Sequence, residues 1–126
     1  MSYAYLNLNP KKKKVGDCVV RALALVMGQS WEDVYTDLTM VGYDLRDMPN
    51  ANPVWDRYLT LNGYTRKHLP NTCPDCYTVR DFCREHPTGR YVLGTGTHAL
   101  GVIDGVYYDT WDTGDLVPVV YWEAKR

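Results

Sequence analysis

The spacing of hydrophobic residues predicts helices in the first part of the chain. Between residues 17 and 27 they recur at intervals of three and four, which places Val19 and Leu23 on one face of an amphipathic helix. Asp17 suits the N-cap of this helix, and Gly28 suits its C-terminal end. The same kind of pattern predicts three further helices, each with a residue suited to its start: residues 30–41 (Ser30), 53–62 (Pro53) and 78–86 (Thr78).

Strand patterns dominate the rest of the chain. Five short segments are rich in β-branched and aromatic residues and are bounded by turn residues: residues 64–69, 91–93, 97–103, 106–111 and 117–122. The two-residue turn Asp104-Gly105 pairs two of them as a hairpin. Residues 1–16 are expected to form an extended arm, in which Pro10 stops strand pairing. N-terminal helices followed by a C-terminal antiparallel β-sheet predict an α+β fold.

Size and charge narrow the class of protein. The 126 residues suit one core, so we expect a single domain over residues 1–126. The formal net charge of −1 gives no general attraction to nucleic acid, and the run from Lys11 to Lys14 is interpreted as a solvated loop. No segment resembles a membrane span or a signal peptide. We therefore expect a cytoplasmic protein that binds neither nucleic acid nor a membrane, with all four cysteines reduced.

Three residues supply the parts of a thiol hydrolase. Cys18 lies in the first turn of the helix over residues 17–27, where unpaired backbone N–H groups and the helix dipole lower the pKa of a thiol. His98 lies at the start of the predicted hairpin, and Asp109 lies on its second strand. The two-residue turn places these two diagonally on one face, so Asp109 is expected to orient the imidazole, whereas Asp112 falls on the opposite face. For Arg21 the sequence leaves two roles open, a source of positive potential or the partner of a carboxylate.

A second set of residues has the spacing of a zinc site. Its four members are ligands of the right type: Cys73, Cys76, Cys83 and His86. The link between the two pairs is short, however, and a helix that begins near Thr78 would turn Cys83 and His86 toward the core. We therefore predict no metal and no other cofactor, with Cys73 and Cys76 as loop thiols.

The order of cysteine, histidine and aspartate resembles that of papain-like cysteine peptidases. Gly16-Asp17-Cys18, followed by the hairpin from His98 to Asp109, looks most like the compact branch that includes the double-glycine leader peptidases. Three segments are also similar to those of small bacteriophage proteins: VGDCVVRAL, TVRDFCREHP and HALGVIDGVYYDTWD. The resemblance implies a papain-like fold.

The resemblance also implies an oxyanion-binding amide near the cysteine. Papain-like enzymes carry a glutamine shortly before the nucleophile, and this chain has Lys12 at that position. The role then passes to Asn9, with Asn7 as the alternative, beside the backbone N–H of Cys18.

Taken with the resemblance, these residues imply a cysteine hydrolase that cleaves a peptide, isopeptide or related amide bond of a peptide or protein substrate. Cys18 would attack the carbonyl, His98 would act as base and then as acid, and Asp109 would orient His98. A phage-encoded protein of this kind would act in the cytoplasm of the host cell. Two other functions stay open at this point: a weakly active or inactive papain-like binding module that targets a host protein, and a small zinc-stabilised interaction domain built on residues 73–86.

Overall fold

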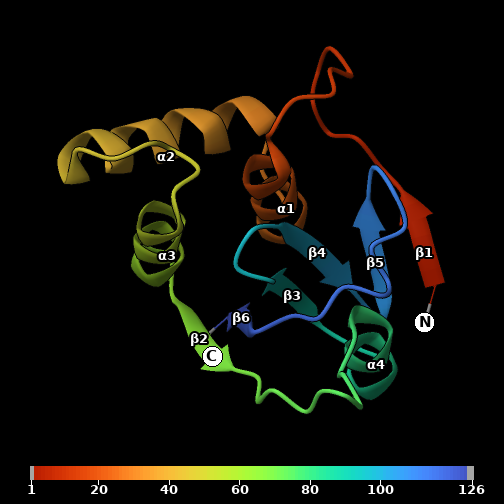
Figure 1. Cartoon of the computed structure of the whole chain (residues 1–126). Helices are drawn as coiled ribbons and strands as arrows, with labels where there is room; N and C mark the ends of the chain where they lie inside the picture. Colours follow the sequence, from red (N-terminus) through yellow and green to blue (C-terminus); the bar gives the residue numbers. More distant parts are fainter. Residues whose placement is uncertain (1, 125–126) are drawn as a thin grey trace.

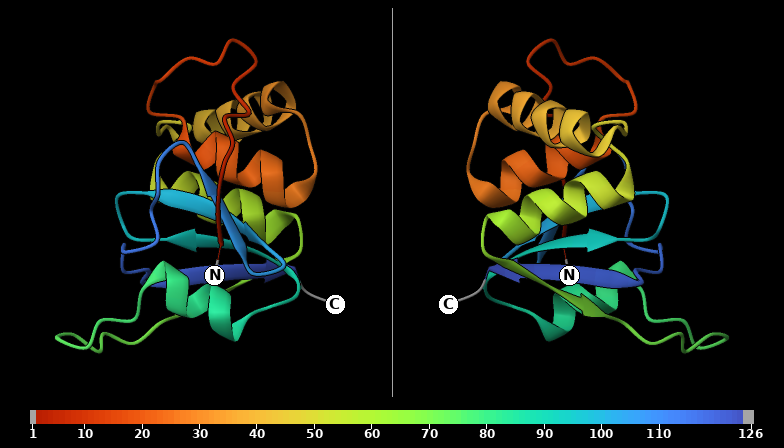
Figure 2. Two further views of the ribbon diagram at one scale, coloured as in Figure 1. Left: turned by 90° about the vertical axis from the view of Figure 1, so that its right-hand side faces the viewer. Right: turned by 90° about the vertical axis from the view of Figure 1, so that its left-hand side faces the viewer.

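A six-stranded sheet forms the middle layer of the fold, and helices cover both of its faces (Figures 1 and 2). The computed structural model describes residues 2–124. The strands lie in the order β1-β5-β4-β3-β6-β2. In chain order the elements are β1 (Ser2–Tyr5), α1 (Cys18–Met27), α2 (Trp31–Leu45), α3 (Asn52–Leu61), β2 (Tyr64–His68), α4 (Val79–Glu85), β3 (Arg90–Gly94), β4 (Ala99–Ile103), β5 (Val106–Asp109) and β6 (Val120–Ala124). The predicted α+β class is confirmed.

Local capping groups set three of the predicted helix boundaries, at Gly28, Ser30 and Thr78. Gly28 ends α1 in the left-handed conformation, with φ of 66°. The Ser30 hydroxyl accepts a hydrogen bond from the Asp33 N–H at 3.0 Å at the start of α2. Thr78 forms a complete capping box at the start of α4. Within residues 2–124, no helix has both the length and the apolar surface that a membrane crossing requires.

The prediction of a purely antiparallel sheet is wrong at one edge. β1 pairs in parallel with β5, which places Tyr5 beside Asp109, while the other neighbouring strands pair antiparallel. The segment predicted as an extended arm therefore contributes a strand. Parallel neighbours need a long crossover between them, and here most of the chain lies between β1 and β5. The alternation in the N-terminal segment indicates a strand but not which strand it joins.

Two hydrophobic clusters hold the helices to opposite faces of the sheet. The first packs buried residues of α1, α2 and α3 against Val92, and the second packs α4 against the next residue, Leu93. α1 packs tightly on the sheet at Gly101, where a Cβ atom would lie 2.8 Å from a methyl carbon of Leu25. This close approach seats α1 directly on β4, and so brings the N-terminus of α1 near the start of β4.

The β4–β5 hairpin has the register that its two-residue turn predicts. Ile103 pairs with Val106. Asp104 and Gly105 have φ of 50° and 77°, the positive values that a type I′ turn requires at both central positions. The register carries Asp109, the last residue of β5, to the end of the hairpin at which β4 begins.

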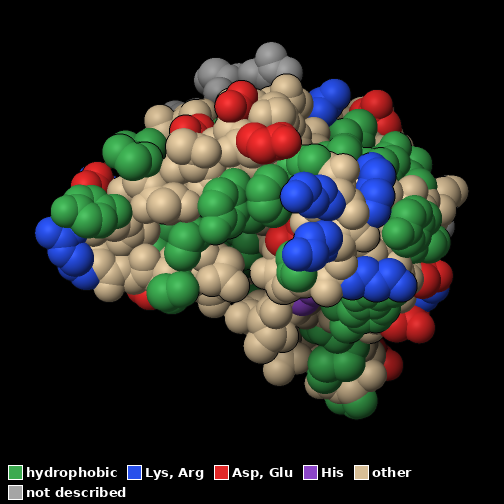
Figure 3. Space-filling view, turned by 90° about the horizontal axis from the view of Figure 1, so that it is seen from above, with side chains coloured by type: hydrophobic (Ala, Val, Ile, Leu, Met, Phe, Trp, Pro, Cys, Tyr) green, Lys and Arg blue, Asp and Glu red, His purple; other side chains and the backbone are tan. Residues whose placement is uncertain are grey.

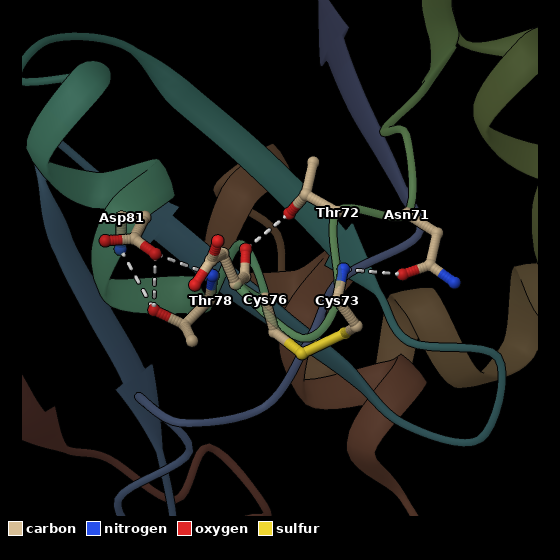
Figure 4. Close-up of a disulfide and its surroundings, with 7 residues drawn as sticks. Asn71, Thr72, Cys73, Cys76, Thr78 and Asp81 are labelled. Carbon is tan, nitrogen blue, oxygen red and sulfur yellow. Dashed lines mark hydrogen bonds between the residues drawn. A yellow bond between two sulfur atoms is a disulfide. The ribbon is translucent and has the colours of Figure 1, made fainter.

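Cys73 and Cys76 form a disulfide, so the prediction that all four cysteines are reduced is wrong for this pair (Figure 4). Their Cα atoms lie 4.1 Å apart in a tight turn. The Thr72 hydroxyl donates to the Asp75 carbonyl at 2.7 Å and holds this turn closed. The spacing of two cysteines is shared by metal sites, loop thiols and disulfides, so only the shape of the turn separates these possibilities.

Loss of this disulfide is expected to lower the stability by less than loss of a disulfide that closes a long loop. The bond between Cys73 and Cys76 closes a loop of only a few residues, for which the chain-entropy estimate is about 2 kcal/mol. Neither cysteine belongs to the two hydrophobic clusters. Urea denaturation of the double variant Cys73→Ser, Cys76→Ser should therefore give a free energy of unfolding lower than that of the wild type by no more than about 2 kcal/mol. A loss above about 4 kcal/mol would show that the turn supports the whole fold.

Candidate functional site

Cys18, His98 and Asp109 come together where the N-terminus of α1 meets the start of β4 and the end of β5. His98 Nε2 lies 2.7 Å from Asp109 Oδ2. Cys18 and His98 lie in the walls of the same cavities, and each side chain shifts the pKa of the other. Because Nε2 faces the carboxylate, Nδ1 is the ring nitrogen available to the thiol. Cys18 is a free thiol and is half-buried.

The electrostatics of the site favour a thiolate and an imidazolium. Burial alone would raise the pKa of the Cys18 thiol, but the hydrogen bond with His98 and the backbone N–H of Ala99 hold that pKa below its ordinary value. Burial alone would lower the pKa of His98, but its hydrogen bonds with Asp109 and Cys18 raise it to about 9. Both shifts favour the ion pair of Cys18 thiolate and His98 imidazolium. The thiolate is the reactive form of a thiol.

Arg21 links the triad carboxylate to a second buried carboxylate. Its Nη1 donates to Asp109 Oδ1 at 3.0 Å, and its Nε donates to Asp17 Oδ1 at 2.8 Å. The exposed fractions of these side chains are 11% for Arg21, 6% for Asp17 and 1% for Asp109. Each oxygen of Asp109 thus faces one cation, the guanidinium on Oδ1 and the His98 imidazolium on Oδ2. Although burial opposes its ionisation, these contacts hold the pKa of Asp109 below its usual range.

The sequence indicates only one of the two ion pairs of Arg21. The spacing of Asp17 and Arg21 is that of neighbours on one helix face, which indicates an ion pair. Nothing local connects Arg21 with Asp109, because 88 residues separate them. Asp17 was expected to cap α1, yet its carboxylate makes no capping hydrogen bond. It accepts instead from three side chains, of which the first is a cation: Arg21, Asn9 and Trp31.

The Asn9 amide binds the Asp17 carboxylate and does not point to Cys18. Asn9 Nδ2 donates to Asp17 Oδ2 at 3.1 Å, and Asn9 Oδ1 accepts from the Lys11 N–H at 3.0 Å. Asn7 Oδ1 in turn accepts from the Asn9 N–H at 3.0 Å, and Asn7 Nδ2 donates to the Lys13 carbonyl oxygen at 3.4 Å. Neither amide therefore faces an oxyanion beside Cys18. The backbone N–H of Cys18, the first residue of α1, has no acceptor within the helix and is the donor that this geometry leaves.

Asp112 does not contact His98. It accepts from the Tyr107 hydroxyl at 2.5 Å and pairs with Arg80 at 3.2 Å. The neighbouring Trp111 does reach the site, since its ring centroid lies 5.7 Å from that of His98. The Trp111 side chain is half exposed and screens one side of the imidazole from water.

Two cavities meet at Cys18 and His98. The first, here called the basic cavity, has a volume of about 560 Å³ and lies between Trp111 and the lysine loop, residues 11–14. The second has a volume of about 410 Å³ and extends toward Trp55. Cys18 and His98 line both of them, so an extended chain that occupies both cavities passes over the thiol.

A third cavity, larger than these two, lies beside the site and does not include it. Its volume is about 600 Å³, and its walls include Trp31 and Tyr35, whose rings stack with centroids 5.1 Å apart. Neither Cys18 nor His98 lines it. It shares four lining residues with the basic cavity: Lys13, Val15, Gly16 and Asp17.

The four residues with zinc spacing do not converge. Cys73 and Cys76 are joined to each other, and Cys83 is buried in the cluster under α4. His86 stacks on Phe82 with ring centroids 3.8 Å apart, and its Nδ1 lies 2.8 Å from the Phe82 carbonyl oxygen. In the part of the chain from residue 2 to residue 124, no cluster of three or more His, Cys, Asp or Glu side chains is placed to hold a metal ion.

Comparisons with known proteins yield no match. The sequence matches no known protein family, and neither a curated protein nor a solved structure is significantly similar to the chain. The function therefore has to be inferred from the residues of the site.

Proposed function

We propose that this protein is a cysteine hydrolase that cleaves a peptide, isopeptide or related amide bond of a peptide or protein substrate. The proposal rests on one arrangement: a free thiol at a helix N-terminus shares its cavities with a histidine that a buried carboxylate holds, and the histidine lowers the pKa of the thiol. Nucleophile, base and orienting group are the parts of a thiol hydrolase. A cysteine on the leading helix, with histidine and aspartate on a following hairpin, also resembles the papain-like fold.

Acylation uses Cys18 and His98, which line the same cavities. The Cys18 thiolate attacks the carbonyl carbon, and the π electrons of the C=O bond move to the oxygen. This oxyanion accepts a hydrogen bond from the backbone N–H of Cys18. The His98 imidazolium then gives its proton to the leaving nitrogen as the C–N bond breaks. The products are a free amine, a thioester on Cys18 and a neutral His98.

Deacylation reverses the proton movements. Neutral His98 takes a proton from water as the water oxygen attacks the thioester carbon. Collapse of the intermediate breaks the C–S bond, releases the acid and restores the thiolate and the imidazolium. The Asp109 carboxylate stays ionised and hydrogen-bonded to His98 Nε2 in both steps. It thereby keeps His98 Nδ1 directed at the reacting atoms. An amine in place of water would give acyl transfer with the same residues.

A binding module without turnover is the second candidate, and one observation favours it. The Asn9 amide bonds to Asp17, so no side-chain amide of this loop assists the Cys18 N–H at the oxyanion. Removal of one oxyanion donor costs a hydrolase about 10²- to 10³-fold in turnover. A protein of this kind would hold a host protein in the same two cavities without cleaving it.

Cys18 is expected to be the more reactive of the two free thiols, Cys18 and Cys83. His98 lowers the pKa of Cys18, whereas burial raises that of Cys83. Iodoacetamide labelling, mapped by mass spectrometry at about pH 6.5, should therefore mark Cys18 first, and His98→Ala should move its labelling profile toward the ordinary thiol pKa of about 8.5. Faster labelling of Cys83 in the folded protein would contradict the assignment of the nucleophile.

Turnover separates the hydrolase from the binding module. A library of internally quenched peptides should yield cleaved products with the wild type and none with Cys18→Ala, which keeps the cavities and removes the nucleophile. Cleavage that depends on Cys18 supports the hydrolase. The binding module is supported instead if Cys18 is reactive but no member of the library is cleaved, and if the wild type and Cys18→Ala bind peptides equally.

A further inference from the structure

The basic cavity carries positive side chains that nothing in its walls neutralises. Lys13 and Lys14 both line it, and both are exposed. Neither forms an ion pair with any residue between 2 and 124. The space-filling view from above shows a group of Lys and Arg side chains beside the histidine visible on that face (Figure 3). An anion that enters this cavity therefore meets two unpaired ammonium groups close to the thiol.

The lysine loop divides its four charges between different roles. Lys12 has a positive φ of 53°, and its Nζ donates to the Asn7 carbonyl at 2.9 Å, so this side chain closes the loop. Lys11 lines the neighbouring large cavity and not the one beside Cys18. Lys13 and Lys14 are thus the two members of the run that a ligand of the basic cavity contacts. The local fold explains why a run that reads as a solvated loop supplies a cavity wall.

The two cavities that meet at Cys18 differ in the charge of their walls. Among the described residues that line the basic cavity, Asp17 is the only acidic one, and it is buried and already paired with Arg21. The second cavity has no lysine or arginine among its described lining residues. Apart from Cys18 and His98, which line both cavities, its one acidic or basic residue is Asp47. A substrate that passes over Cys18 therefore leaves a basic wall and enters a neutral to acidic one.

We propose that the substrate carries an aspartate or glutamate in the segment that occupies the basic cavity, on one side only of the bond that Cys18 attacks. This inference rests on the proposed hydrolase function. The carboxylate would bind Lys13 and Lys14 through charge-assisted hydrogen bonds. An acidic peptide fits better than a nucleic acid, because single-strand binding needs an extended basic groove with aromatic stacking platforms. This cavity is a hollow of about 560 Å³ in a chain of net charge −1.

Charged alkylating reagents test the lysines directly at Cys18. The measured quantity is the ratio of its alkylation rate with iodoacetate, an anion, to its rate with iodoacetamide, which is neutral. In the double variant Lys13→Gln, Lys14→Gln this ratio should fall about fivefold, and the fall should shrink in about 0.5 M salt, which screens exposed charges. Lys11→Gln is the matched control from the same run and should change the ratio far less. The rate with iodoacetamide shows that the thiol and the fold are intact in each variant.

Positional peptide libraries then test the substrate class. Internally quenched peptides that carry Glu, Gln or Lys at one fixed position should be cleaved fastest with Glu at one or more positions on a single side of the scissile bond. The preference for Glu over Gln should disappear in the double lysine variant. A short single-stranded oligonucleotide of thymidines should slow Cys18 alkylation less than a Glu-rich peptide of equal charge.

The outcomes separate this inference from the function on which it rests. If Cys18 reacts no faster than Cys83 with either reagent, the proposed hydrolase fails. If Cys18 is reactive but its rate ratio is the same in the double variant and in Lys11→Gln, the hydrolase stands and the acidic preference is wrong. Stronger protection by the oligonucleotide than by the Glu-rich peptide would assign the lysines to nucleic acid and also overturn the inference.

Discussion

Asp109→Asn is expected to lower turnover by about 10²- to 10⁴-fold while the protein stays folded. An asparagine can present an N–H to Nε2, which turns the ring toward the wrong tautomer, and it removes the negative charge that stabilises the His98 imidazolium. Loss of that charge also lowers the pKa of His98 from its value of about 9. Steady-state kinetics on a cleaved peptide measure the effect. Without a substrate, the rate of Cys18 alkylation below about pH 7 reports it.

Asp112→Asn is the matched control for this prediction. Asp112 lies three residues further along the chain, bonds to Tyr107 and Arg80, and does not touch His98. Its replacement should leave turnover near the wild-type value. Equal losses in the two variants would show that Asp109 is not the orienting group.

The pH dependence of turnover gives a second readout of the same contact. The pKa of His98 is raised to about 9 by its hydrogen bonds with Asp109 and Cys18, against burial, which opposes the charge. Below that pH the ring carries the proton that the leaving nitrogen needs, so turnover should fall as the pH rises through about 9. In Asp109→Asn this fall should move to lower pH. An unchanged profile would mean that the carboxylate does not act on the imidazole.

Arg21→Met is expected to lower the free energy of unfolding at neutral pH by about 3–5 kcal/mol. The substitution keeps most of the side-chain volume and leaves two buried carboxylates, Asp17 and Asp109, without their shared guanidinium. An unpaired buried charge costs far more than the loss of an exposed ion pair. Urea denaturation of the variant and of the wild type measures the difference.

The loss in Arg21→Met should depend on pH in a defined direction. With Arg21 present, the pKa values of Asp17 and Asp109 lie below their usual range despite burial, so the stability they contribute is present above the unfolded-state pKa of about 3.9 and is lost as the pH falls through the folded values. Without Arg21, burial is less opposed and both carboxyls take up protons more readily. The gap between variant and wild type should therefore narrow as the pH falls from about 7 toward 4.

Arg66→Met provides the comparison for an exposed pair. Arg66 lies 3.2 Å from Asp56, and both side chains are more than a third exposed. Its loss should cost less than about 1 kcal/mol, because water and salt screen such pairs. If Arg21→Met costs no more than Arg66→Met, the buried bridge between the two carboxylates does not hold the site together.

The sequence determined the features that depend on neighbours a few residues away. Ser30 and Thr78 start helices through hydrogen bonds to the third residue of the helix, and Gly28 ends one because it adopts a positive φ freely. The Asp104-Gly105 turn set the hairpin register, and the register placed Asp109 within reach of His98. These results follow from the period of strands and helices and from turn geometry, which act over short stretches of chain.

Only the tertiary structure decided the contacts between distant segments. The parallel pairing of β1 with β5, the bridge from Arg21 to Asp109 and the bond from Asn9 to Asp17 all depend on where packed elements come to rest. The close approach of α1 to β4 at Gly101 brings Cys18 to His98, and it is set by side-chain packing across the sheet. Spacing in the sequence shows which groups a chain possesses. Which of them share a buried charge or line one cavity depends on packing, and packing is a property of the whole fold.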